Sequence, residues 1–372
     1  AQHGFRKGRS GADAGFTLNS VLWKCSAKRK KPHLAFLDLQ KAYDSVDRPV
    51  LWDKLRQLGF GGKFLESIKA MYSGDHVTCE SNGVTTNPVY LRRGLRQGCS
   101  LSPMLFALYI VDMSKDLVLS RQGVLLHRVC VSVILFADDI VLVSSTVEGL
   151  QVLQDIVQRH CNILKMKLSI SKSKVMSYSD RRWELCDGNE VLGCLDTITQ
   201  FKYLGVETSL CPGKGARAMQ KRALDLAKSY KGSCLRIARD GPDIVDLALS
   251  LWQNIAIPSV LYGCESVPFS NQTVVEIAKQ QSCIGKFTLG LPSCAPNISS
   301  FVILGLKPFK QLLYSAQLKF YVRLSKQGDE RWSKDALLDH LVGGWESPYL
   351  KFLLGIKTEV GMDRWPISEK FV

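Results

Sequence analysis

Apolar runs that end in acidic residues alternate with amphipathic stretches along the first part of the chain. Residues 33–39 (HLAFLDL) are apolar up to Asp38, which predicts a buried strand that delivers this acid. Residues 47–49 (DRP) supply a cap and a first-turn proline for a helix with its leucines on one face. A second helix is predicted over residues 63–72. The pattern therefore predicts a strand followed by helices.

A hairpin with acids at its tip is predicted further along. Residues 131–143 (VSVILFADDIVLV) are two β-branched apolar runs separated by Ala137, Asp138 and Asp139. After the hairpin, Ser145 and Glu148 form a capping box for the clearest helix of the chain. Other predicted features are a turn-rich strand-like stretch at 76–90, a basic loop at 92–99, a helix from 102, a Ser/Lys segment at 169–174 and a hairpin at 201–206.

The character of the chain changes near residue 216, where it becomes basic and helical. Arg217, Lys221, Lys228 and Lys231 lie near one stripe of this predicted helix. Further helices are predicted over residues 243–255 and 310–324. We place a domain boundary near 206–216, marked by the sequence CPGKG at 211–215, which gives domains of residues 1–205 and 206–372.

The net charge of the chain indicates the chemical class of its binding partner. The chain of 372 residues carries 49 Lys and Arg against 34 Asp and Glu, a net charge of +15, and residues 1–31 hold +7 of it. Since 46% hydrophobic content argues against disorder, a basic surface on a folded chain indicates a polyanionic partner. No run is long enough to span a membrane and no signal peptide is recognisable. The 12 cysteines form no C-x-x-C pair, which favours a reducing compartment.

Three acids could act together. Asp38 ends one predicted strand, and Asp138 and Asp139 sit at the tip of a predicted hairpin. Aspartate is common in turns and caps, and for an isolated pair that interpretation is favoured. If the strands adjoin in one sheet, however, the carboxylates converge, and such a cluster is costly unless cations neutralise it. Two Mg²⁺ ions held by these oxygens would serve phosphoryl transfer.

Five motifs in order carry a family resemblance: AFLDLQKAYDSVD, GLRQGCSLSPMLF, LFADDIVLV, LKMKLSISKSKVM and FKYLG, preceded by QHGFRKGRS. Together they resemble a reverse transcriptase of the non-LTR (LINE-type) retrotransposon class. The resemblance covers roughly the first 205 residues, and LYGCES at 261–266 is a weaker marker beyond them. It implies an α+β right-hand polymerase with an antiparallel palm sheet, helices on one face, partial fingers, and a helical thumb and C-terminal region.

The resemblance also implies an activity, partners and a location. The activity would be RNA-directed DNA polymerisation, in which dNMP is transferred onto a primer 3′-OH. The partners would be an RNA template, a DNA primer and dNTPs, and the cofactors two Mg²⁺ ions, with Mn²⁺ as a substitute. Such a protein would be intracellular, in the nucleus and in cytoplasmic ribonucleoprotein, and not secreted.

The resemblance implies roles for individual residues wherever a position of this chain matches a motif of the family. Asp38, Asp138 and Asp139 would be the catalytic, metal-binding carboxylates, and the Leu39 carbonyl would complete one ion's shell. Tyr43 matches an aromatic steric gate against the ribose 2′-OH, although an ordinary core tyrosine is the alternative. The other matches are Gln97 and Gly98 beside the incoming nucleotide, Lys172 near the leaving pyrophosphate, and Tyr203, Leu204 and Gly205 as primer grip.

Several of these matches have rivals. Lys174 competes with Lys172, and Ser169 departs from the family's usual Asn. Basic residues would contact phosphates, Arg6 and Arg9 from the fingers and Arg217 and Lys221 from the thumb, whereas a solvated face is the alternative for any charge run.

The resemblance leaves three alternatives open. The family's fingers normally begin upstream of QHGFRKGRS, and neither an endonuclease nor a Cys/His knuckle is recognisable, so we expect a fragment of a retrotransposon polyprotein. Without those fingers, nucleotide closure could fail and leave the fragment inactive. A non-enzymatic alternative is a relic of a retroelement, which would fold and bind nucleic acid but not catalyse a reaction. A group II intron or telomerase-type reverse transcriptase shares the acids.

Overall fold

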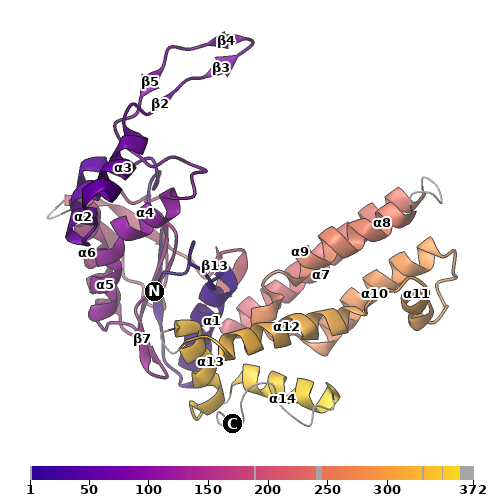
Figure 1. Ribbon diagram of the computed structural model, residues 1–372. Helices are drawn as coiled ribbons and strands as arrows, with labels where there is room; N and C mark the ends of the chain where they lie inside the picture. The colour runs from indigo at the N-terminus through magenta and orange to yellow at the C-terminus, as the bar shows by residue number, and fades with distance from the viewer. Residues whose placement is uncertain (1, 188–189, 240–244, 329–330, 346, 361–372) are drawn as a thin grey trace. The chain divides into compact units, whose positions relative to one another are not determined.

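The computed structural model describes residues 2–187, 190–239, 245–328, 331–345 and 347–360 (Figure 1). The chain divides into two compact units. The first comprises Ala1–Ala14, Lys31–Leu125 and Cys130–Ile198, and the second Gly15–Lys30, Leu126–Val129 and Thr199–Val372. This compact division differs from the expected domains of residues 1–205 and 206–372, which remain a prediction about function.

A six-stranded sheet forms the centre of the first unit, in the order β11, β12, β10, β1, β9, β8. The strands are β1 His33–Leu37, β8 Val133–Phe136, β9 Asp139–Ser144, β10 Lys174–Met176, β11 Trp183–Asp187 and β12 Glu190–Thr197. β1 is buried throughout and antiparallel to both neighbours, as its apolar run predicts. The expected wholly antiparallel sheet was wrong at one pair, because the chain turns back along edge strand β11 and so enters β12 parallel to β10.

The helices of the first unit begin close to the predicted positions, except α5, which was not predicted. They are α2 Arg48–Gln57, α3 Gly62–Tyr72, α4 Ser102–Tyr109, α5 Val111–Leu119 and α6 Val147–Ile163. Asp47 caps α2, because its Oδ1 accepts a hydrogen bond from the Val50 N–H at 3.2 Å. The expected capping box of Ser145 and Glu148 was wrong, since Thr146 caps α6 and accepts from the Gly149 N–H at 3.0 Å.

The turn-rich stretch forms a thin arm that extends from the end of α3 (Figure 1). It consists of β2 His76–Val77 paired with β5 Val89–Tyr90, and of β3 Glu80–Ser81 paired with β4 Val84–Thr85. All eight strand residues are exposed. A two-stranded ribbon of this kind buries no apolar face, so its conformation depends on how its base is anchored.

Helices dominate the second unit. They are α7 Pro212–Arg239, α8 Val245–Leu251, π-helix η2 Trp252–Ala256, α9 Ile257–Leu261, 3₁₀-helix η3 Cys264–Ser266, α10 Asn271–Thr288, α11 Asn297–Ile303, α12 Phe309–Ser325, α13 Trp332–Val342 and α14 Pro348–Val360. The hairpin of β13 Gln200–Tyr203 and β14 Val206–Ser209 also belongs to this unit, as does most of α1 Gly11–Ala27. The short strands β6 Val124–Leu126 and β7 Val129–Val131 are divided between the two units.

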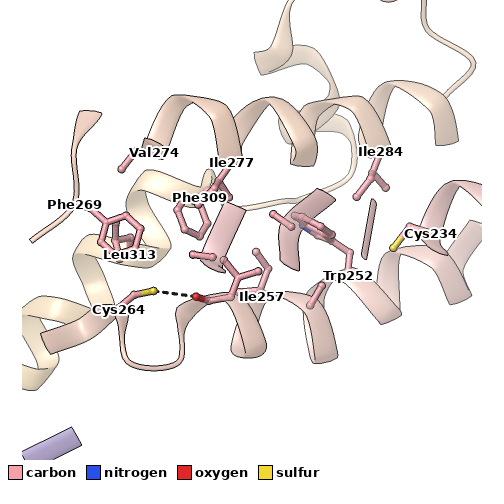
Figure 2. Packing of buried hydrophobic residues seen from close by; sticks show 14 of the residues in the cluster. Cys234, Trp252, Ile257, Cys264, Phe269, Val274, Ile277, Ile284, Phe309 and Leu313 are labelled. Atoms are coloured by element: carbon pink, nitrogen blue, oxygen red, sulfur yellow. Dashed lines mark hydrogen bonds between the residues drawn. The ribbon is translucent and has the colours of Figure 1, made fainter. Parts of the chain in front are cut away.

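The core of the second unit forms where α7, η2, α9, α10 and α12 meet around Trp252 (Figure 2). Trp252 is fully buried, and Ile277 and Phe309 pack in the same cluster. The helix predicted from residue 243 is present from Val245 onward, while 243 and 244 lie outside the described residues. The sequence CPGKG does not separate two elements, because its proline is the first residue of α7. Among the described residues, no helix is long and apolar enough to cross a membrane.

Candidate active site

Asp38 follows β1 directly, and the Ser/Lys segment holds its backbone. Its N–H donates to Ser173 Oγ at 3.1 Å, and its carbonyl accepts from the Ser169 N–H at 2.8 Å. The next residue, Leu39, is buried and pairs with Leu168 in an isolated antiparallel bridge. These contacts fix the point at which the Asp38 carboxylate leaves the sheet.

The hairpin of β8 and β9 brings the other two acids to the same end of the sheet. Asp139 is the first residue of β9, and Asp138 lies in the two-residue turn before it. The register of β9 against β1 pairs Ile140 with Leu37, so the flanking residues in this register are Asp139 and Asp38. The structure therefore brings Asp38 close to two adjacent acids that follow it by about 100 residues in the sequence.

Asp38 lies close enough to Asp138 and Asp139 for its charge to affect the ionisation of both carboxyl groups. Burial raises the pKa of Asp138, and the neighbouring charge of Asp38 adds to the effect. Burial likewise raises the pKa of Asp139 to about 6, with further contributions from Asp138 and Asp38. Loss of water and a nearby like charge both disfavour the ionised form of a carboxyl group. We call Asp38, Asp138 and Asp139 the acidic cluster.

The acidic cluster fits a divalent cation by the chemistry of its donors. Carboxylate oxygens suit Mg²⁺, and a bound cation would relieve the repulsion that raises the pKa values of Asp138 and Asp139. One protein cation lies beside the cluster: Lys172 Nζ is 3.7 Å from Asp38 Oδ2 on a largely exposed side chain. In the parts of the chain that the structure describes, no three His, Cys, Asp or Glu side chains are close enough to enclose a metal ion.

Tyr43 lies near the acidic cluster and is partly buried. Its ring stacks on Phe106, with centroids 5.1 Å apart and 15° between the planes. Burial raises the pKa of Tyr43, and the charge of Asp138 adds to this. The hydroxyl is buried and finds no hydrogen-bond partner among the described residues. Trp252 Nε1 in the core of the second unit likewise has no partner among the described residues, so the Tyr43 hydroxyl alone does not mark a ligand site.

The loop of Gln97 and Gly98 returns toward the segment that follows Asp38. Gln97 Nε2 donates to Asp44 Oδ1 at 3.1 Å. Gly98 is exposed and has a φ of 81°, which a side chain would strain. Gln97 and Gly98 thus form a solvent-facing turn beside Asp44, the residue that follows Tyr43.

A cleft of about 420 Å³ opens beside Asp38. Its lining includes Asp38 and Asp44 together with five basic residues, Lys41, Arg93, Lys165, Lys167 and Lys172. Lys174, the rival of Lys172, is engaged elsewhere, since its Nζ lies 2.6 Å from Asp196 Oδ2. Basic side chains therefore line the cleft on the Asp38 side of the acidic cluster, an arrangement suited to phosphate groups.

The predicted primer grip is a tight hairpin, and it belongs to the second unit. Tyr203 ends β13, and the turn residues Leu204 and Gly205 have φ values of 47° and 80°. Tyr262 Oη donates to the Leu204 carbonyl at 2.8 Å. A Cβ on Gly205 would lie 2.7 Å from Tyr262 Cε1, so this turn requires glycine on two counts.

The predicted phosphate contacts are divided between the two units. Arg6 is exposed in the first unit, whereas Arg9 Nη1 donates to the Gln2 carbonyl at 2.6 Å. Arg217 and Lys221 are exposed on α7 in the second unit. The structure thus leaves Arg6, Arg217 and Lys221 on the surface and gives Arg9 an internal partner.

Sequence reasoning missed Ser173, which holds Asp38 in place. Its side chain is fully buried, whereas that of Lys172 is 73% exposed. Ser173 lies between a turn at residues 170–172 and the start of β10, and no pattern in the sequence distinguishes it from the neighbouring Ser171.

A mixed α/β unit with an acidic cluster at a sheet end, beside a basic cleft, defines a protein suited to nucleotide chemistry. The chain belongs to the reverse transcriptase (RNA-dependent DNA polymerase) family, whose sequence profile matches residues 1–208. The identification made from the five motifs is confirmed.

Curated relatives are retrotransposon proteins. The chain is 28% identical over 214 residues to the Retrovirus-related Pol polyprotein from type-2 retrotransposable element R2DM of Drosophila melanogaster, which covers 55% of this chain and 20% of that polyprotein. It is 25% identical over 311 residues to the Retrovirus-related Pol polyprotein from type-1 retrotransposable element R2 of Popillia japonica. That alignment covers 79% of this chain and 42% of the Popillia polyprotein. The chain thus spans about a fifth of the R2DM polyprotein.

Among solved structures, telomerase from Candida albicans in complex with the TWJ fragment of telomeric RNA is similar over 87% of this chain and 52% of that chain. The TM-score is 0.38 and the sequence identity 11%. A likeness at this level does not distinguish one class of reverse transcriptase from another.

Proposed function

We propose that this chain carries the polymerase site of a non-LTR retrotransposon and adds deoxynucleotides to a primer 3′-OH under the direction of an RNA template. The observation that carries the proposal is the acidic cluster, in which burial and mutual repulsion raise the pKa of Asp139 to about 6. Such a cluster is unfavourable as it stands and is suited to cations.

Asp38, Asp138 and Asp139 would hold two Mg²⁺ ions, with the Leu39 carbonyl as a further ligand. When bound, these ions activate the attacking 3′-oxygen and stabilise the leaving pyrophosphate. The chain supplies the fixed carboxylates: Ser169 and Ser173 hold the backbone of Asp38 on both sides. Mn²⁺ would substitute because it takes the same oxygen ligands.

The basic cleft would accept the triphosphate of the incoming dNTP. Lys172 borders both the cleft and Asp38, so its ammonium group could stabilise charge on the leaving pyrophosphate. The Tyr43 ring, which Phe106 supports from one side, would stand where a ribose 2′-OH would collide with it. Gln97 offers an amide to the nucleotide or template from the neighbouring loop.

The nucleic acid would be held through contacts that do not read sequence. The hairpin of Tyr203, Leu204 and Gly205 would hold the primer end, and Arg217 and Lys221 on α7 would follow phosphates of the duplex. Arg6 would contact template or triphosphate phosphates. Arg9 was expected to do the same, but its hydrogen bond to the Gln2 carbonyl favours an internal role.

Primer extension tests the proposal directly. The purified chain, given poly(rA)/oligo(dT), dTTP and Mg²⁺, is expected to extend the primer, and Asp138→Ala is expected to abolish extension. Asp155→Asn is a matched control, because Asp155 is an exposed acid on α6 away from the cluster. Equal extension by Asp138→Ala and the parental chain would contradict the assignment of the cluster.

A non-catalytic nucleic-acid-binding relic is the second candidate. It would need only the basic residues that line the cleft, which would bind phosphates whether or not the carboxylates hold a metal ion. Salt-sensitive binding of the RNA–DNA duplex without any extension, in Mg²⁺ or Mn²⁺, would support the relic. Binding together with Asp138-dependent extension would exclude it.

A further inference from the structure

The segment of residues 2–10 (QHGFRKGRS) packs against the hairpin of the acidic cluster. Gln2 forms a parallel bridge with Leu135 on β8, and the His3 N–H donates to the Leu135 carbonyl at 2.7 Å. At the turn, Gln2 Oε1 accepts from the Ala137 N–H at 3.1 Å, and Gln2 Nε2 donates to the Ala137 carbonyl at 3.3 Å. One side-chain amide therefore satisfies both backbone groups of a turn residue, as a paired strand would.

The turn needs such support. Ala137 has a φ of 57°, in the left-handed region that alanine rarely adopts. A residue in this region keeps its conformation only where its surroundings impose it. Ala137 directly precedes Asp138, so a change in its backbone would redirect both carboxylates of the hairpin.

The Gln2 amide is itself held in place. Its Oε1 also accepts from the Gly4 N–H at 2.9 Å, and Arg9 Nη1 donates to the Gln2 carbonyl at 2.6 Å. A Cβ on Gly4 would lie 2.4 Å from the Ala137 nitrogen, far inside contact distance. Only glycine lets the segment approach the turn this closely.

We propose that Gln2 is a positioning residue for the polymerase reaction: its side-chain amide fixes the Ala137 turn and thereby aims Asp138 and Asp139. Gly4 permits the approach, and Arg9 secures the Gln2 backbone instead of meeting a phosphate. The catalytic consequence rests on the proposed function, whereas the clamp on the turn does not.

Hydrogen exchange tests the clamp without any activity measurement. In Gln2→Ala, the Ala137 amide loses its acceptor and is expected to exchange roughly tenfold faster, as measured by NMR. The Val143 amide, which donates to the Ser132 carbonyl at 2.9 Å, is the internal reference and should not change. Gly4→Ala keeps the glutamine but blocks the approach, so it should give the same pattern.

Primer extension tests the positioning role. Gln2→Ala is expected to lower kcat roughly 10- to 100-fold while the KM for template–primer changes less than about twofold, because the carboxylates are misplaced but the nucleic-acid contacts remain. Gln151→Ala is the matched control, because Gln151 on α6 also makes a side-chain hydrogen bond, to Asp155, outside the hairpin. The control should retain the parental kcat.

Each of the other possible results overturns the clamp, the positioning role or the proposed function. An Ala137 amide that stays protected in Gln2→Ala overturns the clamp, and faster exchange with an unchanged kcat overturns its positioning role. Faster exchange at Val143 as well would show that Gln2 supports the whole sheet, which also overturns the proposal. If the parental chain does not extend a primer, the proposed function fails while the exchange measurement still decides the clamp.

Discussion

At the scale of single residues, the acidic cluster places unfavourable charge in the folded chain. The pKa of Asp139 is raised to about 6 from its ordinary value near 3.8, mainly by burial. The folded chain therefore binds this proton more tightly than the unfolded chain does. Below about pH 4 the Asp139 carboxyl group is protonated in both the folded and the unfolded chain, so it does not destabilise the fold. The free-energy penalty of its ionisation grows as the pH rises and is complete above about pH 6.

Asp139→Asn removes this charge and is expected to stabilise the metal-free chain. We expect an increase of about 1–2 kcal/mol in the free energy of unfolding at neutral pH, a value that allows for the solvent-exposed part of the side chain. The gain should disappear below about pH 4. Urea unfolding with EDTA over a pH series measures it, with Asp155→Asn as the exposed control. Parallel pH profiles for Asp139→Asn and the parental chain would contradict the raised pKa.

Tyr43 gives a second prediction at this scale, which separates ring from hydroxyl. Because the proposed gate is the ring, Tyr43→Ala should lower discrimination between dNTP and rNTP by roughly 10- to 100-fold, whereas Tyr43→Phe should keep it. The ratio of kcat/KM for dTTP and UTP on poly(rA)/oligo(dT) measures it. Unchanged discrimination in Tyr43→Ala would make Tyr43 a core residue that packs on Phe106.

Sequence could identify the acids of the site but not the groups that hold them. Asp38, Asp138 and Asp139 stand out because polar residues interrupt apolar strands, and the motifs fix their order. Gln2 and Ser173 act on these acids through the backbone, and such contacts depend on tertiary structure. Nothing in a residue type reveals which backbone group its side chain will meet across more than 100 residues of sequence.

At the scale of elements, Arg48 joins α2 to the base of the arm and to the loop before Gln97. It is buried, and its guanidinium donates to the carbonyls of Gly94 at 3.0 Å, Leu91 at 2.8 Å and Tyr72 at 3.1 Å. It also forms an ion pair of 2.7 Å with Asp75. One side chain therefore fixes both ends of a ribbon that has no core of its own.

Arg48→Met should destabilise the chain much more than loss of a surface arginine. Removal of one partner of a buried ion pair costs about 3 kcal/mol and here also leaves three carbonyls unsatisfied. Arg56→Met on the same helix is the control, because Arg56 is exposed and pairs with the exposed Asp53. Urea unfolding compares the two. A loss below about 1 kcal/mol for Arg48→Met would show that water replaces these contacts.

Local signals predicted the elements better than their assembly. The apolar run of β1 and the cap of α2 are determined by neighbouring residues, and both were predicted at the right place. The parallel pairing of β12 with β10 joins segments through the edge strand β11, and no local pattern encodes it. Three adjacent hydroxyl residues, Ser144 to Thr146, precede α6, and the helix takes the last of them, Thr146, as its cap instead of the predicted Ser145.

At the scale of the whole molecule, the basic residues that give the net charge of +15 do not all have the same role. Some of the basic residues near the start of the chain have internal partners: Arg9 binds the Gln2 carbonyl, and Lys24 pairs with Asp339 at 2.6 Å. The +7 of residues 1–31 is also divided between the two compact units, since Arg6, Lys7 and Arg9 belong to the first and Lys24 to the second. The exposed stripe of α7 keeps Arg217 and Lys221 available for phosphates.

The double variant Arg217→Ala/Lys221→Ala tests whether this stripe meets the duplex. Each phosphate contact contributes nearly one unit to the slope of log K against log salt, so the slope for an RNA–DNA duplex should fall by about two in fluorescence anisotropy. Lys115→Ala/Arg159→Ala removes the same charge from residues that already pair with Asp112 and Asp116, so its slope should not change. Equal slopes for both double variants would mean that α7 only adds to overall charge. A smaller slope in the α7 variant alone would place the duplex along this helix.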